Sequence, residues 1–391
     1  MGASRRLGFA GFVATAVTFG PARNGYGLFL PEIREEFGLS TQMLGFIASG
    51  LYVGYLAALL AVGLLAARNG PRLPVTIGLL SAGVGMALVA FSHSVTVLAA
   101  GVVIAGTAAG WSWAPYNDTV GRTVPAASGD RVLSVISTGT TLGVAVAGLA
   151  ALAATTHGLP WRTAWFGFAA GALAAAVSNA ALLPRGTGFP GNGRAVDRPG
   201  LRWFWRPASA PLFVVAFCFG VVNAVYWSFA VDAVSGATGP PAVTGPLLYA
   251  TLGTSGFAGL LTGDTVARFG LRRTLCVTLV CVGIAAGLLG LAPALLPAVM
   301  ASAVLFGAGT MFMSALLSLW SSAAFRERPS SGFSAALLFF GGGGVVGPAL
   351  VGATVGESGL RPAFAFMAAL SVATAFIRPK RRVRGPEPRE Y

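Results

Sequence analysis

The chain has 391 residues, of which 55% are hydrophobic and only 10% are charged. A soluble protein carries about 25% charged residues, so this composition excludes a soluble globular protein and indicates one embedded in a lipid bilayer. The net charge of +14 would suggest a nucleic-acid partner in a soluble protein. In a membrane protein the basic residues sort by membrane side instead, so we expect no nucleic-acid partner.

Twelve apolar segments are long enough to cross the bilayer, which takes about 20 residues of helix. They predict an all-α membrane protein with twelve transmembrane helices. The predicted spans are 7–30, 42–66, 73–92, 96–117, 132–155, 163–183, 210–232, 244–266, 273–292, 297–322, 333–355 and 363–378.

The basic residues orient these spans. If both termini are cytoplasmic, all lysines and arginines fall on the cytoplasmic side except Arg23, Arg34, Arg162 and Arg361. This asymmetry follows the positive-inside rule, so we expect a multi-pass protein with both termini in the cytoplasm.

The first span contains a deeply placed arginine, Arg23. It lies seventeen residues after Arg6, roughly 25 Å along a helix at about 1.5 Å per residue. A guanidinium group binds carboxylates and phosphates, so Arg23 is a candidate anchor for an anionic substrate in a central cavity. Two alternatives are that the side chain snorkels to the outer surface or pairs with Glu32.

The first and seventh spans carry the same pattern two hundred positions apart. Phe19-Gly20, Tyr26 and Phe29 recur as Phe219-Gly220, Tyr226 and Phe229, and Asn223 stands where the repeat places a partner for Arg23. We therefore predict a substrate cavity lined from both halves of the chain. The candidate cavity residues are Arg23, Asn24, Tyr26, Asn223, Tyr226 and Trp113.

A second repeat follows the second and eighth spans. Residues 63–72 and 263–272 share the frame Gly-x3-Ala-Arg-x-Gly-x-Arg. We expect each copy to be a tight cytoplasmic hairpin between two helices, with Gly70 and Gly270 at positive φ, where a side chain would strain the backbone.

This frame resembles the loop between the second and third helices of the major facilitator superfamily. Ala67 and Ala267 stand where that family has an aspartate thought to latch the two halves together, and Pro71 replaces one of its arginines. The stretch from Arg23 to Pro31 also resembles first-helix sequence of bacterial members, which implies a bacterial inner membrane. By this resemblance the candidate gating residues are Gly63, Arg68, Gly70, Arg72, Asp118, Asp264, Arg268, Gly270 and Arg272.

The inner end of the fourth span is rich in aromatic residues, including Trp111, Trp113 and Tyr116. These side chains either line the cavity or form an interfacial belt, and the sequence does not separate the two. We expect Asp118, beside them, to pair with Arg72, Arg122 or Arg131 near an inner gate.

Glycines recur every four or five residues in the fifth and eleventh spans. This spacing favours close helix packing, because small residues let backbones approach. It also resembles the superfamily's antiporter motif, from which Val144 departs by replacing a proline. The helix-packing candidates are Gly139, Gly143, Gly148, Gly343, Gly347, Pro348 and Gly352.

The resemblance implies two six-helix bundles related by a pseudo-twofold axis normal to the membrane. We assign residues 1–183 to the first bundle, 184–207 to a cytoplasmic linker, 208–378 to the second bundle and 379–391 to a basic tail. The linker 184–207 is rich in proline and glycine, which argues against a third folded domain there.

Enzymatic chemistry finds no support in the sequence. The two histidines, His93 and His157, both fall in short loops, and no phosphate loop or metal-ligand pattern is present. The cysteines Cys218, Cys276 and Cys281 lie inside apolar runs and predict neither a disulfide nor a metal site. We expect no catalytic residue, no metal and no cofactor.

These features predict a secondary transporter that moves a small solute, most plausibly an organic anion or metabolite, by alternating access. The partners expected are that small molecule and the lipid bilayer, and we expect a monomer. Proton coupling is implied by the resemblance but not by a deep carboxylate. Two alternatives are a proton-coupled exporter of amphipathic drug-like compounds and a non-transporting membrane receptor on the same fold.

Overall fold

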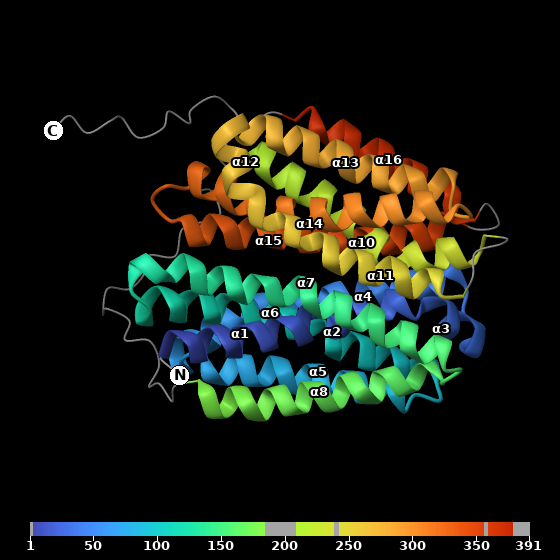
Figure 1. Cartoon of the computed structure of the whole chain (residues 1–391), viewed down its shortest axis with the longest axis horizontal. Helices are drawn as coiled ribbons and strands as arrows, with labels where there is room; N and C mark the ends of the chain where they lie inside the picture. The colour runs from blue at the N-terminus through green and yellow to red at the C-terminus, as the bar shows by residue number, and fades with distance from the viewer. Residues whose placement is uncertain (1–2, 184–208, 238–241, 356–358, 378–391) are drawn as a thin grey trace.

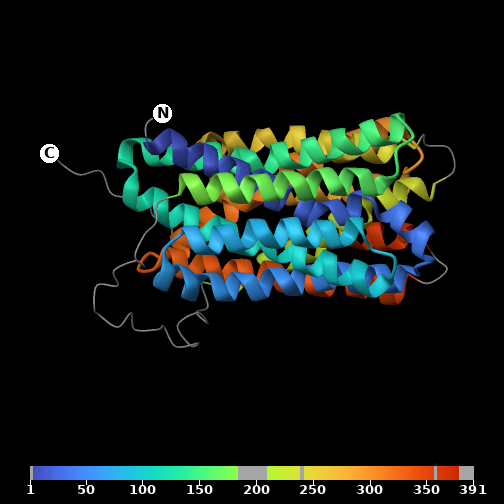
Figure 2. The same cartoon turned by 90° about the horizontal axis from the view of Figure 1, so that it is seen from below.

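A computed structural model describes residues 3–183, 209–237, 242–355 and 359–377. In these ranges the chain is helical and contains no strand. The helices run nearly parallel to the long axis of the molecule (Figures 1 and 2). Helices are the expected form because the bilayer offers no hydrogen-bond partner to backbone groups.

Residues 3–183 form eight helices, which fill one half of the molecule (Figure 1). They are α1 (Ala3–Phe19), α2 (Pro21–Leu28), α3 (Leu30–Phe37), α4 (Thr41–Asn69), α5 (Arg72–Ala90), α6 (Val95–Thr123), α7 (Ala126–Thr156) and α8 (Trp161–Leu182).

The described residues from 209 onward form the other half (Figure 1). Their helices are α10 (Ala210–Ser235), α11 (Thr244–Ser255), the 3₁₀ turn η1 (Gly256–Leu261), α12 (Thr262–Phe269), α13 (Leu271–Leu291), α14 (Leu296–Ala324), α15 (Pro329–Thr354) and α16 (Leu360–Ala375). The predicted linker and the whole of the predicted tail lie outside the described residues, so these domain boundaries stay predictions.

Nine helices in the described part of the chain are long and apolar enough to cross a membrane: α4, α5, α6, α7, α8, α10, α13, α14 and α15. Each coincides with one predicted span, and the ends differ by at most six residues. The prediction of an all-helical membrane fold is confirmed.

The other three predicted spans differ from single long helices. The first is broken into α1, α2 and α3, because Pro21 and Pro31 supply no backbone N–H at the two junctions. The eighth is divided by η1, which contains Gly256 and Gly259. The twelfth is the 16-residue α16, which begins at Leu360, three residues before the prediction.

Glycines mark the closest helix contacts. A Cβ on Gly143 would lie 2.0 Å from the Ala16 carbonyl oxygen, so α7 packs directly on the backbone of α1. In the other half, a Cβ on Gly343 would lie 2.1 Å from the Phe217 carbonyl oxygen, which brings α15 against α10 in the same way. The remaining glycines of the predicted packing set, and Pro348, make similar close approaches: Gly139 to Phe12, Gly148 to Ala250, Gly347 to Val221, Gly352 to Gln42, and Pro348 to Gly45.

The first residues of α1 and the last of α16 lie at the same end of the helices, here called the terminus face (Figure 1). Helix α3 lies at the other end, here called the opposite face. The two hairpins after α4 and α12 turn at the terminus face. Gly70 has φ 75° and Gly270 has φ 81°, which confirms the predicted positive φ at both turns.

Candidate functional site

The break between α1 and α2 places Arg23 inside the protein. Every residue of α2 is buried, and Arg23 itself is only 8% exposed. The break frees the Phe19 carbonyl oxygen from helical pairing, and the Asn24 side-chain amide Nδ2 donates to it at 2.6 Å. Asn24, a predicted cavity residue, therefore stabilises the kink that positions Arg23.

Four aromatic rings surround the guanidinium group of Arg23. Its Cζ lies 4.4 Å from the centroid of the Tyr55 ring and 5.1 Å from that of Tyr52, both on α4. Phe19 on α1 lies at 5.8 Å and Phe340 on α15 at 5.9 Å. We call these four residues the Arg23 cage. Because Phe340 comes from the second half of the chain, the cage spans the contact between the two halves.

The side chains of Tyr52 and Tyr55 lie close enough to Arg23 to interact with it electrostatically. Tyr52 also contacts the side chain of Asn223, which is 2% exposed on α10. Tyr52 therefore lies near both Arg23 and its predicted repeat partner Asn223.

Arg23 has no carboxylate partner among the residues that the structure describes. The ion pairs found there within 4.0 Å are Arg34–Asp232 and Arg162–Glu36, so Arg23 is not paired with Glu32. Its low exposure also excludes a side chain that extends to the surface. Each cation–π contact contributes about 0.5–2 kcal/mol, depending on desolvation, yet aromatic faces give no directional acceptors for the five N–H donors of a guanidinium.

Two of the predicted cavity residues are used in packing within their own halves. The Tyr26 hydroxyl donates to the Leu44 carbonyl oxygen at 3.0 Å. The Tyr226 hydroxyl shares a 2.7 Å hydrogen bond with Ser302 Oγ, and its ring stacks on Phe306 with a centroid distance of 3.5 Å. These two tyrosines are sequence equivalents, but neither belongs to the Arg23 cage.

Trp113 also lies outside the cage. It packs on a separate cluster of the first half that includes Leu7, Tyr116 and Ile136. Tyr116 donates a short hydrogen bond to Asn179 Oδ1 on α8. The aromatic end of α6 therefore packs within this half, and the structure does not place Trp113 among the rings around Arg23. Its role in a substrate cavity stays a prediction.

The predicted gating residues surround the two hairpins at the terminus face. Arg72 is half-buried, whereas Gly63, Asp264, Arg268, Gly270 and Arg272 are exposed, and the side chain of Arg68 lies outside the described residues. Asp118 is exposed and interacts electrostatically with Arg122, one helical turn away. No ion pair within 4.0 Å joins Asp118 or Asp264 to a described arginine.

Tyr52, Tyr55 and Phe340 do not stand out as site residues from the sequence alone. One signal was present: Tyr52 and Tyr55 are three residues apart in an otherwise apolar span, and that spacing puts both rings on one helix face. Phe340 had no such signal, because only helix packing brings α15 against α4.

An ion pair joins the two halves at the opposite face. Arg34 on α3 donates from Nε to Asp232 Oδ1 at 3.0 Å and from Nη2 to Oδ2 at 2.6 Å. Arg34 Nη1 also donates to Thr41 Oγ1 at 3.2 Å. The carboxylate belongs to α10, so this bidentate contact closes the first half against the second at this face.

A second ion pair stays within the first half. Arg162 Nη2 donates to Glu36 Oε1 at 2.6 Å and to the Ser92 carbonyl oxygen at 2.5 Å. Trp161 Nε1 donates to Glu36 Oε2 at 2.7 Å. These contacts tie α3 to α8 and to the end of α5.

A family model described as Major Facilitator Superfamily matches residues 7–231 and 212–390 of the chain. No curated protein matches the chain. Among solved structures, the nucleoside transporter NupG is similar with a TM-score of 0.77 and 12% identity, covering 96% of this chain and 98% of its own.

Two further transporters have the same fold. The peptide transporter POT, solved in complex with sulfate, aligns with a TM-score of 0.76 and 14% identity over 96% of this chain and 93% of its own. A bacterial homologue of the human lysosomal transporter Spinster, solved in an inward-facing, unoccupied conformation, aligns with a TM-score of 0.66 and 18% identity, covering 96% and 94%. These likenesses show the fold.

Proposed function

The chain belongs to the Major Facilitator Superfamily and is therefore a multi-pass membrane transporter and not an enzyme, and from this premise we propose that it moves a small organic anion by alternating access, with Arg23 as the anion-binding residue. The observation that carries the proposal is the buried, aromatic-caged Arg23, which has no carboxylate partner in the described part of the chain.

The charge of Arg23 is costly without a counter-charge. On insertion scales an arginine at the centre of a membrane helix costs about 2.5–3.5 kcal/mol, so such residues are functional candidates. The aromatic rings offset part of this cost. A substrate carboxylate would supply the missing negative charge and accept two parallel N–H bonds from the guanidinium fork.

The tyrosines of the cage support the same chemistry. The hydroxyl oxygens of Tyr52 and Tyr55 can accept hydrogen bonds from Arg23, and their own O–H groups then remain available to a bound anion. The cage would hold a carboxylate by both charge and hydroxyl donors.

The cage also suits alternating access. Phe19, Tyr52 and Tyr55 belong to the first half, and Phe340 belongs to the second. Any rotation of one half against the other changes this set of rings around Arg23. Substrate binding and the conformational switch are thereby linked through one residue.

The test is ligand-dependent thermal stability of the purified transporter, because a ligand that binds the folded state raises its melting temperature. A panel of carboxylates is compared with a panel of cationic drugs. We expect carboxylates to stabilise the parent and Arg23→Ala to abolish the effect. Arg23→Lys keeps the charge but loses the bidentate geometry, so it should bind weakly.

The matched control is Arg361→Ala, which removes an exposed arginine in the first turn of α16 and should leave the carboxylate response unchanged. If Arg23→Ala responds to carboxylates like the parent, Arg23 is not the anchor. If only cationic drugs stabilise the parent, export of amphipathic compounds becomes the better assignment.

Orientation and assembly complete the proposal. The arginine distribution favours a terminus face in the cytoplasm of a bacterial inner membrane, and we expect a monomer. A membrane-impermeant thiol reagent added outside should then label a cysteine at His157 and not one at Asn69. Light scattering after gel filtration measures the oligomeric state.

A further inference from the structure

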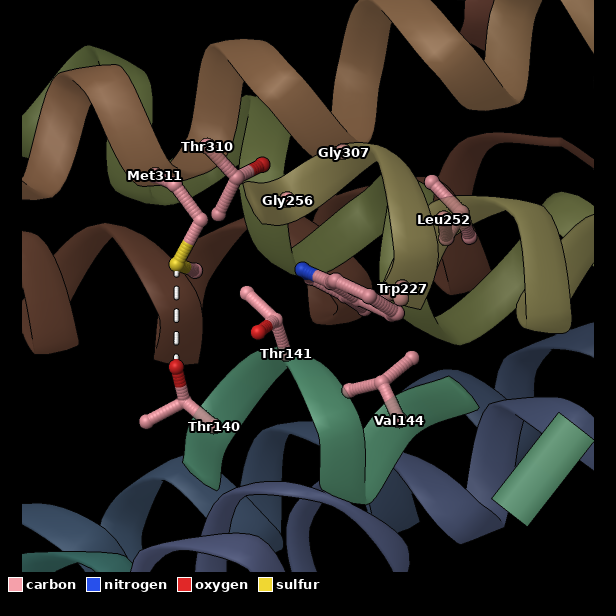
Figure 3. Close-up of a pocket in the computed structure, with 10 residues that line it drawn as sticks. Thr140, Thr141, Val144, Trp227, Leu252, Gly256, Gly307, Thr310 and Met311 are labelled. Atoms are coloured by element: carbon pink, nitrogen blue, oxygen red, sulfur yellow. Dashed lines mark hydrogen bonds between the residues drawn. The ribbon is translucent and has the colours of Figure 1, made fainter. Parts of the chain in front are cut away.

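A small cavity of about 20 Å³ lies between α7, α10, α11 and α14, where the two halves meet (Figure 3). Thr140 and Thr141 on α7 belong to the first half, and Thr310, Met311 and Trp227 belong to the second. This volume has room for about one water molecule or one hydroxyl group. The lining contains no charged side chain, so it suits a neutral hydrogen-bonding group.

The hydroxyl groups of this cavity have unused hydrogen-bonding capacity. Thr140 Oγ1 donates to the Ser137 carbonyl oxygen at 2.7 Å, and Thr141 Oγ1 donates to that of Thr138 at 2.8 Å. Both oxygens keep acceptor sites, because a hydroxyl donates once and accepts twice. Thr310 Oγ1 is buried and has no hydrogen-bond partner in the described structure.

A buried hydroxyl without a partner costs free energy, so such groups are normally satisfied by protein, water or ligand. Figure 3 shows Thr310 and Thr141 on opposite sides of the space, with the indole nitrogen of Trp227 directed between them. Thr140 Oγ1 also lies 3.7 Å from Met311 Sδ, across the contact between the halves. Thr310 Oγ1 is therefore without a partner in the described structure, while Thr140 and Thr141 keep acceptor sites.

A chain of polar contacts leads from this cavity to the Arg23 cage. Trp227 Nε1 donates to Asn223 Oδ1 at 3.2 Å, and Asn223 contacts Tyr52, which contacts Arg23. Asn223 and Trp227 are four residues apart on α10, about 6 Å along the helix axis.

We propose that this cavity is a second substrate subsite, which binds a hydroxyl group of the anion held at Arg23. The substrate class is then a hydroxylated organic anion whose hydroxyl is remote from its carboxylate. This inference rests on the proposed function and names its substrate class. Thr310 is the specificity-determining residue, because its hydroxyl is the one with no partner in the protein.

The experiment compares matched ligand pairs that differ by one hydroxyl group. Hexanoate and 6-hydroxyhexanoate are the central pair, with the shorter and longer homologous pairs beside them to vary the span. Binding to the full-length detergent-solubilised transporter is measured by thermal shift and calorimetry. The variants are Thr310→Val, which removes the hydroxyl and keeps the shape, and Thr310→Ser, which keeps the hydroxyl.

We expect the parent to prefer the hydroxylated member of the best-fitting pair by roughly two- to tenfold, the effect of one net neutral hydrogen bond. Thr310→Val should remove the preference while hexanoate affinity stays unchanged, and Thr310→Ser should retain it. The control Thr254→Val, at an exposed threonine of α11 that bonds to Ala250, should behave like the parent.

The outcomes separate this inference from the proposed function. If carboxylates bind in an Arg23-dependent way but no pair shows a hydroxyl preference, or Thr310→Val leaves the preference intact, the cavity is only a water site and the inference fails alone. Equal weakening of both members by Thr310→Val also overturns it, because that reports disturbed packing. If the parent binds no carboxylate, both proposals fall.

Discussion

Arg23, Arg34 and Arg162 all lie outside the predicted cytoplasmic side, but they differ in the groups that surround them. Arg34 is paired with Asp232, and Arg162 is paired with Glu36. Arg23 instead faces aromatic rings and tyrosine hydroxyls. Since the same protein supplies carboxylates to the other two arginines, the different surroundings of Arg23 favour a counter-charge that arrives with the substrate.

Glu32 is a second residue whose surroundings matter, because they change the pKa of its carboxyl group. It lies on α3 at the opposite face, outside the membrane-crossing segments, and its Oε2 is buried with no hydrogen-bond partner among the described residues. Burial raises the pKa of this carboxyl group, and the nearby Glu35 carboxylate raises it further. The folded protein thus binds this proton more tightly than the unfolded chain does.

We therefore expect Glu32→Gln to stabilise the protein in a pH-dependent way. The group stabilises the fold fully below its unfolded pKa, and this contribution is lost as the pH rises through the raised folded pKa. Glu32→Gln should raise the melting temperature at pH 8 and leave it unchanged below pH 4.5, the ordinary pKa. Melting curves of the solubilised protein at several pH values measure this.

The comparison variant is Glu35→Gln on the same helix, whose side chain is exposed. It should change the melting temperature less than Glu32→Gln at pH 8. An equal gain at pH 4 and pH 8 for Glu32→Gln would show that the titration of Glu32 is not the cause.

At the scale of elements, the two hairpins at the terminus face share one backbone feature. Gly70 ends α4 with φ 75°, and Gly270 connects α12 to α13 with φ 81°. Their sequence frame is repeated, and so is their conformation. Any side chain there would place an L-residue in the left-handed region, at a cost of about 1 kcal/mol or more.

We expect Gly70→Ala to slow transport while leaving substrate affinity nearly unchanged, because the hairpin lies between two helices that move with the switch and not at the Arg23 cage. Uptake rates in vesicles and binding constants from calorimetry separate the two effects. Gly121→Ala on α6 is the control, since no atom lies within 4 Å of an added Cβ at that glycine. A normal uptake rate for Gly70→Ala would show that the hairpin only connects the two helices and does not affect the switch.

At the scale of the whole molecule, the described ion pair between the halves lies at the opposite face. Arg34 and Asp232 come from α3 and α10, 198 residues apart in sequence. Close packing reinforces this contact, because a Cβ on Gly27 would lie 1.8 Å from the Trp227 carbonyl oxygen. The Tyr249 hydroxyl donates to the same oxygen at 2.7 Å. The structure is thus closed at this face.

Removing the charge of Asp232 should favour opening there. In a variant without Cys218, Cys276 and Cys281, spin labels at His157 and Ala294 report the separation of the two halves. We expect Asp232→Asn to lengthen and broaden the distance distribution, because the bidentate contact to Arg34 is lost.

Glu36→Gln provides the matched control, because it breaks the ion pair with Arg162, which lies within the first half. Its distance distribution should match that of the parent. If Asp232→Asn also matches the parent, apolar packing alone closes this face and the ion pair is not a latch.

The sequence by itself determined most of the spans, the repeat and the hairpin backbone. Lipid accepts no unpaired backbone groups, so a long apolar stretch such as 42–66 has to be a helix, and its length fixes its ends. A glycine after a helix end predicts a left-handed turn because only glycine adopts it without strain, as at Gly70. Arg23 stood out because a charge among apolar residues is costly wherever the helix packs.

Only the tertiary structure decided what surrounds these residues. The repeat makes Tyr26 and Tyr226 equivalent, yet one bonds to Leu44 and the other to Ser302. The partners of a side chain depend on how each helix is rotated and on which helix packs against it. That choice depends on contacts between residues far apart in sequence, such as Phe340 with Arg23. Hydrophobic length is a local property of the chain, whereas a binding site formed by several helices is not.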